Sequence, residues 1–123
     1  MFSAILLEHD DSSCAAVENL ALESKQVAFL KILSRFPQAS ELSRILNTST
    51  PDLAFLDLSD WDSAVAAAED IRELAPQTAI IGFGADWEAR KEAQCAAAGV
   101  TELLVSPVTL KKFQDCVNRA IHI

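Results

Sequence analysis

The sequence predicts an α/β fold: a doubly wound parallel sheet of five strands with helices on both faces, in a three-layer sandwich. Five short apolar runs alternate along the chain with five longer segments whose apolar residues recur at helical spacing. Such alternation is typical of parallel strands joined by helices, and right-handed crossovers leave few topologies for it. The 123 residues contain only 3 glycines and 4 prolines, with no visible linker or repeat, which predicts one domain over residues 1–123.

The predicted strands are short apolar runs bounded by polar or turn residues. The first run is nearly continuous, as expected for a strand that is buried on both faces. After the fourth run, the Gly82–Ala85 segment (Gly-Phe-Gly-Ala) is predicted as a loop. The strands are expected at residues 3–7, 27–33, 53–56, 78–81 and 101–105.

The helices are predicted from apolar spacing and from the residues that can begin or end them. The third helix ends at Ala75, because Pro76 disfavours helix at the residue before it, and the fourth ends at Gly99. Residues able to cap the N-termini are Asp11 or Ser12 for the first helix, Ser59 or Asp60 for the third, and Asp86 for the fourth. Core positions are expected at Cys14, Val17 and Ala21, at Ala39, Leu42, Ile45 and Leu46, at Ala64, Ala67, Ala68, Ile71, Leu74 and Ala75, and at Leu110, Phe113, Val117, Ala120 and Ile121.

The composition excludes several function classes. A net charge of −8 disfavours binding to a nucleic-acid backbone, which needs a basic surface. No apolar run is long enough to span a bilayer, and the first apolar run has no basic segment before it, so neither a membrane anchor nor a signal peptide is predicted. The chain is therefore expected to be cytoplasmic.

The 3 cysteines, Cys14, Cys95 and Cys116, include no C-x-x-C pair. Each falls in a predicted helix, so buried free thiols in a reducing compartment are expected.

Acidic residues follow two of the predicted strands. The cluster Glu8-His9-Asp10-Asp11 follows the first strand, and Asp57 follows the third. In doubly wound sheets, ligands bind beyond the carboxyl ends of the strands, where the strand order reverses. Carboxylates gathered at such an edge favour a divalent cation and phosphoryl chemistry.

The order and spacing of four features resemble the receiver domains of two-component response regulators, the CheY-like family. The resemblance covers nearly the whole chain, from residue 3 to about residue 121, and implies the flavodoxin-like strand order 2-1-3-4-5. The four features are the acidic cluster at 8–11, the run from Pro51-Asp52 to Asp57, residues 99–105, and Ser106-Pro107.

The resemblance implies a role for each matching position. Asp57 stands at the phosphoacceptor position, where its carboxylate would attack a phosphoryl group. Asp10 matches one of the two acidic residues that hold Mg²⁺, and the backbone carbonyl of Ser59 would be a further ligand.

Four positions depart from the family's pattern. His9 stands where the other acidic metal ligand is usual, and imidazole suits a hard cation poorly, so weak Mg²⁺ binding is expected. Gly84 replaces the Thr or Ser that bonds the phosphoryl group, and Ser106 replaces the usual lysine. Leu103 occupies the position of the switch aromatic residue. A salt bridge from His9 to Asp57 or Asp10 is a hypothesis for what replaces the metal.

The leading interpretation is a degenerate receiver that serves as a protein-interaction module and is not an enzyme. Its partners would be a second copy, bound through the fourth helix, fifth strand and fifth helix (residues 86–123), or a covalently linked output or ATPase domain. Residues 99–108 resemble the N-terminal receiver-like domain of CpaE-type pilus-assembly ATPases. A working receiver that takes phosphate from a histidine kinase is the alternative. A flavodoxin-like enzyme or cofactor binder is disfavoured, because the loop after the first strand is acidic and lacks glycine.

Overall fold

The computed structural model describes residues 2–7, 11–33, 35–84, 89–105 and 108–121, with backbone only for residues 11–14 and 89–92. Strands and helices alternate strictly, as predicted. The elements are β1 (Phe2–Leu7), α1 (Asp11–Ser24), β2 (Val27–Leu33), α2 (Ala39–Thr48), β3 (Leu53–Asp57), α3 (Trp61–Leu74), β4 (Ala79–Gly84), α4 (Ala89–Ala98), β5 (Glu102–Val105) and α5 (Leu110–Ile121).

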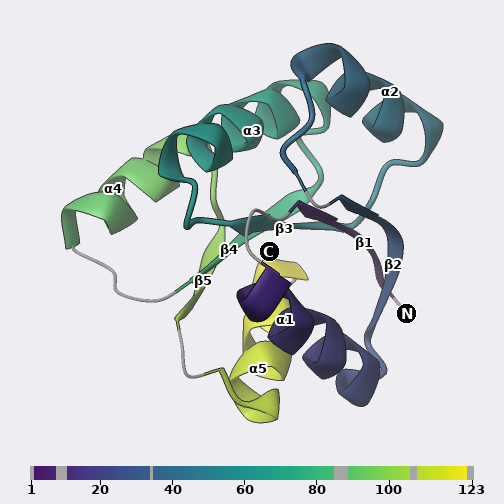
Figure 1. Cartoon of the computed structure of the whole chain (residues 1–123), viewed down its shortest axis with the longest axis vertical. Coiled ribbons are helices and arrows are strands. Elements are labelled where there is room, and N and C mark those ends of the chain that lie inside the picture. Colours follow the sequence, from purple (N-terminus) through teal and green to yellow (C-terminus); the bar gives the residue numbers. More distant parts are fainter. Residues whose placement is uncertain (1, 8–10, 34, 85–88, 106–107, 122–123) are drawn as a thin grey trace.

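The five strands form one sheet in the order β2-β1-β3-β4-β5, and all four pairings are parallel. This confirms the predicted fold class and strand order. Helices α1 and α5 cover one face of the sheet, and α2, α3 and α4 cover the other (Figure 1). The order reverses between β1 and β3, so the carboxyl ends of these two strands border the place where such folds bind ligands.

The core has two layers because strand side chains alternate between the faces. In β3, Leu53 and Phe55 pack in the layer under α1 and α5, whereas Ala54 and Leu56 pack in the layer under α2, α3 and α4. Phe55 lies centrally in the first layer. Its ring centroid is 5.7 Å from that of Phe113 in α5 and 5.8 Å from that of Phe29 in β2.

The start of α3 and the end of α4 lie at residues that the sequence predicted. Asp60, rather than Ser59, caps α3, and its side chain accepts a hydrogen bond from the backbone N–H of Ser63. Gly99 follows α4 with a φ of 107°, a left-handed conformation that glycine adopts without strain. Cys95 and Cys116 are buried free thiols, as predicted, whereas the Cys14 side chain and Asp86 lie outside the described residues.

Four predictions about the elements were wrong. Ala39 is exposed rather than part of the core, because it is the first residue of α2. Residues 82–84 are not a loop: β4 continues to Gly84, because Gly82, Phe83 and Gly84 pair with Leu103, Leu104 and Val105 of β5. Leu74 is 44% exposed, since it lies at the margin of the α3 face that buries Ala64, Ala68 and Ile71. Leu110 and Ile121 are only half-buried because they form the two ends of α5.

Within the part of the chain that the structure describes, no helix has the length and apolar character needed to cross a membrane.

Candidate functional site

Asp57 is the last residue of β3 and lies at the carboxyl end of the sheet. It pairs with Phe83 of β4 and is completely buried, at 0% exposure. Its Oδ1 accepts a hydrogen bond of 3.0 Å from the backbone N–H of Ser59, which closes the turn between β3 and α3. A buried carboxylate needs such donors, because water no longer solvates it.

The end of β1 lies beside the end of β3. Leu7, the last residue of β1, pairs with Leu56, the residue before Asp57. His9 and Asp10 come next along the chain but lie outside the described residues, so the predicted salt bridge of His9 stays a hypothesis. The pairing of β1 with β3 nevertheless places Leu7 at the carboxyl edge of the sheet, directly before the acidic cluster predicted at residues 8–11.

Gly84 ends β4 one residue beyond Phe83 and pairs with Val105, the last residue of β5. Glycine has no hydroxyl, so this position can offer only its backbone to a bound group. Ser106 follows Val105 directly and lies outside the described residues. Asp57 and Gly84 therefore share one edge of the sheet, and the chain leaves Val105 towards Ser106 at that same edge.

Leu58, which the sequence had not singled out, links Asp57 to the predicted switch position. Its backbone N–H donates to the carbonyl of Phe83 at 3.0 Å, and its side chain is nearly buried in the layer under α3. The Leu58 and Leu103 side chains both lie over Gly82, on the side where a Cβ would project. Leu103 packs against the same core layer. The apolar run from Leu53 to Leu58, interrupted only by Asp57, was the available signal for Leu58.

Replacing Gly82 with Ala is expected to destabilise the domain. The new methyl group would overlap Leu58 Cδ1 and approach Leu103 Cδ2 to 3.3 Å. Overpacking of this kind costs about 1–3 kcal/mol of unfolding free energy, measurable by urea denaturation. Leu58→Val in the Gly82→Ala background should restore part of the loss by shortening the obstructing side chain. A Gly82→Ala variant as stable as the wild type would contradict this packing.

Mg²⁺ binding at this edge stays a prediction. Among the described residues, no three His, Cys, Asp or Glu side chains are grouped closely enough to hold a metal ion. The described oxygen donors are the Asp57 carboxylate and the Ser59 carbonyl, and the other predicted ligands, His9 and Asp10, are not described. These oxygens suit a hard cation, but they are too few to form a site alone.

No protein-family model matches the chain. The transcriptional regulatory protein CitT of Bacillus subtilis is 30% identical over 112 residues, which are 90% of this chain and 49% of that protein. A response regulator from Thermotoga maritima has a TM-score of 0.83 at 19% identity, with 100% of this chain and 99% of that chain covered. The chain has the fold of response-regulator receiver domains. This is the CheY-like fold that the sequence predicted.

A second class of protein shares this fold. A protein of Burkholderia thailandensis described as a pilus assembly protein (cpaE) has a TM-score of 0.79 at 20% identity and covers 98% of both chains. Likeness at this level of identity concerns the fold and not the activity. The chain spans about half the length of its curated relative, so the activity and partners of a whole protein enter only as proposals.

Proposed function

We propose that this receiver-like domain acts as a protein-interaction module whose state does not depend on phosphorylation of Asp57, and that it is not an enzyme. The observation that carries the proposal is Gly84, which stands beside Asp57 at the sheet edge without a hydroxyl to bond a phosphoryl group. Ser106 in place of a lysine, and His9 in place of a carboxylate, support it from the sequence.

The free energies of the missing contacts to a phosphoryl group support the same conclusion. A charge-assisted contact to phosphate is worth roughly 1.5–3 kcal/mol, against about 1 kcal/mol for a neutral hydrogen bond. Loss of the lysine, the hydroxyl and one metal carboxylate would together weaken a phosphorylated state by several such contributions. The signal would also lack its usual relay, because Leu103 packs as a plain aliphatic side chain beside Leu58.

The surface proposed for the interaction is the face formed by α4, β5 and α5. Val105 of β5 is 38% exposed there, and Arg119 of α5 forms a 3.2 Å ion pair with Glu102 of β5. Interfaces combine apolar contacts with a polar rim, and this face offers groups of both kinds. The partner would be a second copy of the chain or a linked output or ATPase domain.

A working phosphoacceptor is the second candidate. It is favoured by the position of Asp57 at the carboxyl end of β3, and by the likeness to a curated transcriptional regulatory protein over 90% of this chain. It would require Mg²⁺ and a histidine kinase as phosphate donor.

Two-dimensional NMR of the domain separates the candidates. We expect no saturable shifts around Asp57 and Ser59 on addition of millimolar Mg²⁺ and then beryllofluoride, and the same oligomeric state with and without them. Asp57→Asn is the matched control. Shifts that spread from Asp57 to α4 and disappear in this variant would overturn the proposal in favour of the phosphoacceptor.

A further inference from the structure

A hollow on the opposite flank of the domain lies between the edge strand β2 and helix α2, with a volume of about 330 Å³. None of its lining residues belongs to β3, β4 or β5, so it is distinct from the Asp57 edge. We call it the β2–α2 hollow. The residues that matter to the argument are the apolar Ile5, Leu30 and Ile45, the cationic Lys31 and Arg44, and the acidic Glu41.

A β-bulge in β2 contributes to the lining of the hollow. Phe29 pairs with Ala4 and Lys31 pairs with Ile5, so Leu30 is an extra residue in β2. In a regular strand, neighbouring side chains point to opposite faces. Here the consecutive residues Leu30 and Lys31 both line the same hollow, as a bulge allows.

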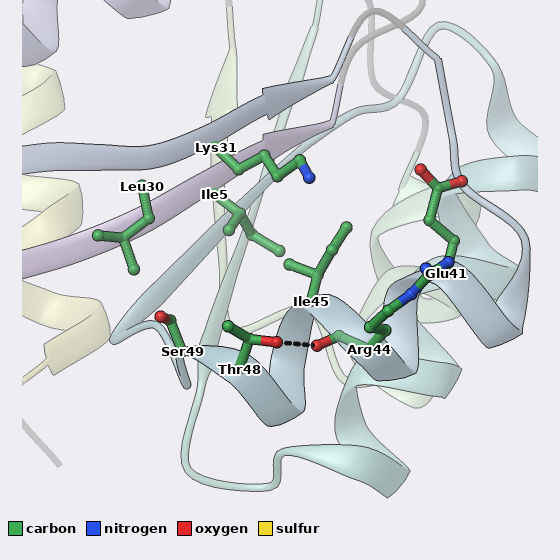
Figure 2. A pocket seen from close by; sticks show the side chains of 8 residues that line it. All are labelled: Ile5, Leu30, Lys31, Glu41, Arg44, Ile45, Thr48 and Ser49. Carbon is green, nitrogen blue, oxygen red and sulfur yellow. Dashed lines mark hydrogen bonds between the residues drawn. The ribbon is translucent and has the colours of Figure 1, made fainter.

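The hollow is apolar in its middle and at one end, and cationic towards the other end. Figure 2 shows Leu30 towards one end, Arg44 towards the other, and Ile5 and Ile45 between them, with the Lys31 side chain extending over the middle. Ile5 is completely buried as a floor, whereas Leu30 is 52% exposed and so has apolar surface that a bound molecule could cover.

Within the described part of the chain, no acidic side chain forms an ion pair with either cation of the hollow. The chain has 18 acidic and 10 basic side chains, yet neither Lys31 nor Arg44 forms an ion pair with any described residue. Glu41, at the same end, has its carboxylate held by Arg35 at 3.1 and 3.3 Å. Arg35, from outside the hollow, thus offsets part of the negative charge of Glu41, and Lys31 and Arg44 stay available to an anion.

We propose that the β2–α2 hollow binds a small amphipathic anion, a molecule with a short apolar body and a carboxylate or phosphate head. The apolar body would lie over Ile5, Leu30 and Ile45, and the head would lie between Lys31 and Arg44. A pocket of this size suits a small ligand. Edge-to-edge pairing of β2 with another chain is disfavoured, because a bulge and a lysine on an edge strand both oppose it.

The test is an NMR titration of the full chain with octanoate and, in a second arm, octyl phosphate. Either should give saturable shifts at Leu30, Lys31, Arg44, Ile45 and Thr48, and the tighter of the two identifies the head group. Acetate and octylammonium should not saturate the same resonances, since one lacks the apolar body and the other carries the wrong charge.

Matched variants locate the binding. Lys31→Met and Arg44→Met should each weaken it about threefold to tenfold, the range for loss of one partly exposed charge contact. Glu41→Gln should tighten it. Lys25→Met should leave it unchanged, because Lys25 lines a different hollow, with Leu22, Phe29 and Ile32 on the α1 side of β2. Unsaturable shifts, equal binding of octylammonium, or shifts centred on that second hollow would overturn the proposal.

Discussion

The Cys116 thiol in the folded domain will react with iodoacetamide at pH 8 about a thousandfold more slowly than the same thiol in the urea-unfolded chain. Cys116 is completely buried in the core layer under α1 and α5. The pKa of this thiol is raised from 9.0 to about 12, mainly by burial and also by the negative charge of Glu102, against a smaller opposing effect of the positive charge of Arg119. The reacting species is the thiolate, whose population falls about tenfold for each unit by which the pKa rises.

Mass spectrometry of the alkylated peptides measures both rates, and Cys116→Ala identifies the peptide. Lack of access to the buried sulfur slows the reaction in the same direction as the raised pKa. Equal rates in the folded and unfolded chains would mean that Cys116 is accessible, contrary to its place in the core.

The raised pKa of Cys116 also predicts how the stability of the domain depends on pH. Because the folded pKa is the higher one, the folded state keeps the thiol proton above pH 9, where the unfolded chain releases it. The contribution of this group to stability is therefore complete below pH 9 and is lost as the pH rises towards 12, by about 1.4 kcal/mol per pH unit. Between pH 9 and pH 12, the unfolding free energy measured by urea denaturation should fall more steeply for the wild type than for Cys116→Ala.

Phe55→Ala is expected to lower the unfolding free energy by about 3–5 kcal/mol, a large part of the 5–15 kcal/mol typical of a domain. Phe55 is completely buried at the centre of β3, between the rings of Phe29 and Phe113. Truncation removes its apolar contacts and leaves a cavity that neighbouring strands, fixed by their hydrogen bonds, cannot close.

Urea denaturation followed by circular dichroism measures the loss. Phe55→Leu should cost less, because it keeps most of the volume. Phe29→Ala, on the half-buried edge strand β2, is the matched aromatic control and should cost less than Phe55→Ala. If the edge residue proved the more costly of the two, the central role of Phe55 would be contradicted.

Local sequence patterns determined the fold class and the approximate position of every strand. The limits of β2 were predicted correctly, and Asp60 was one of two residues predicted to cap α3. Such features depend on the spacing of apolar residues and on capping chemistry, which act within a few residues. The position of Asp57 at the end of a buried strand followed from the same short-range signals. The strand order, by contrast, came from the resemblance to receiver domains.

The tertiary structure alone decided the features that depend on contacts between distant segments. β4 extends to Gly84 because β5 supplies hydrogen-bonding partners for residues that would otherwise form a loop. Leu58 and Leu103 meet over Gly82, and the bulge in β2 directs Leu30 and Lys31 into one hollow. Sequence spacing carries no information about which side chains meet across a sheet, since register and bulges set those contacts only when the strands pair.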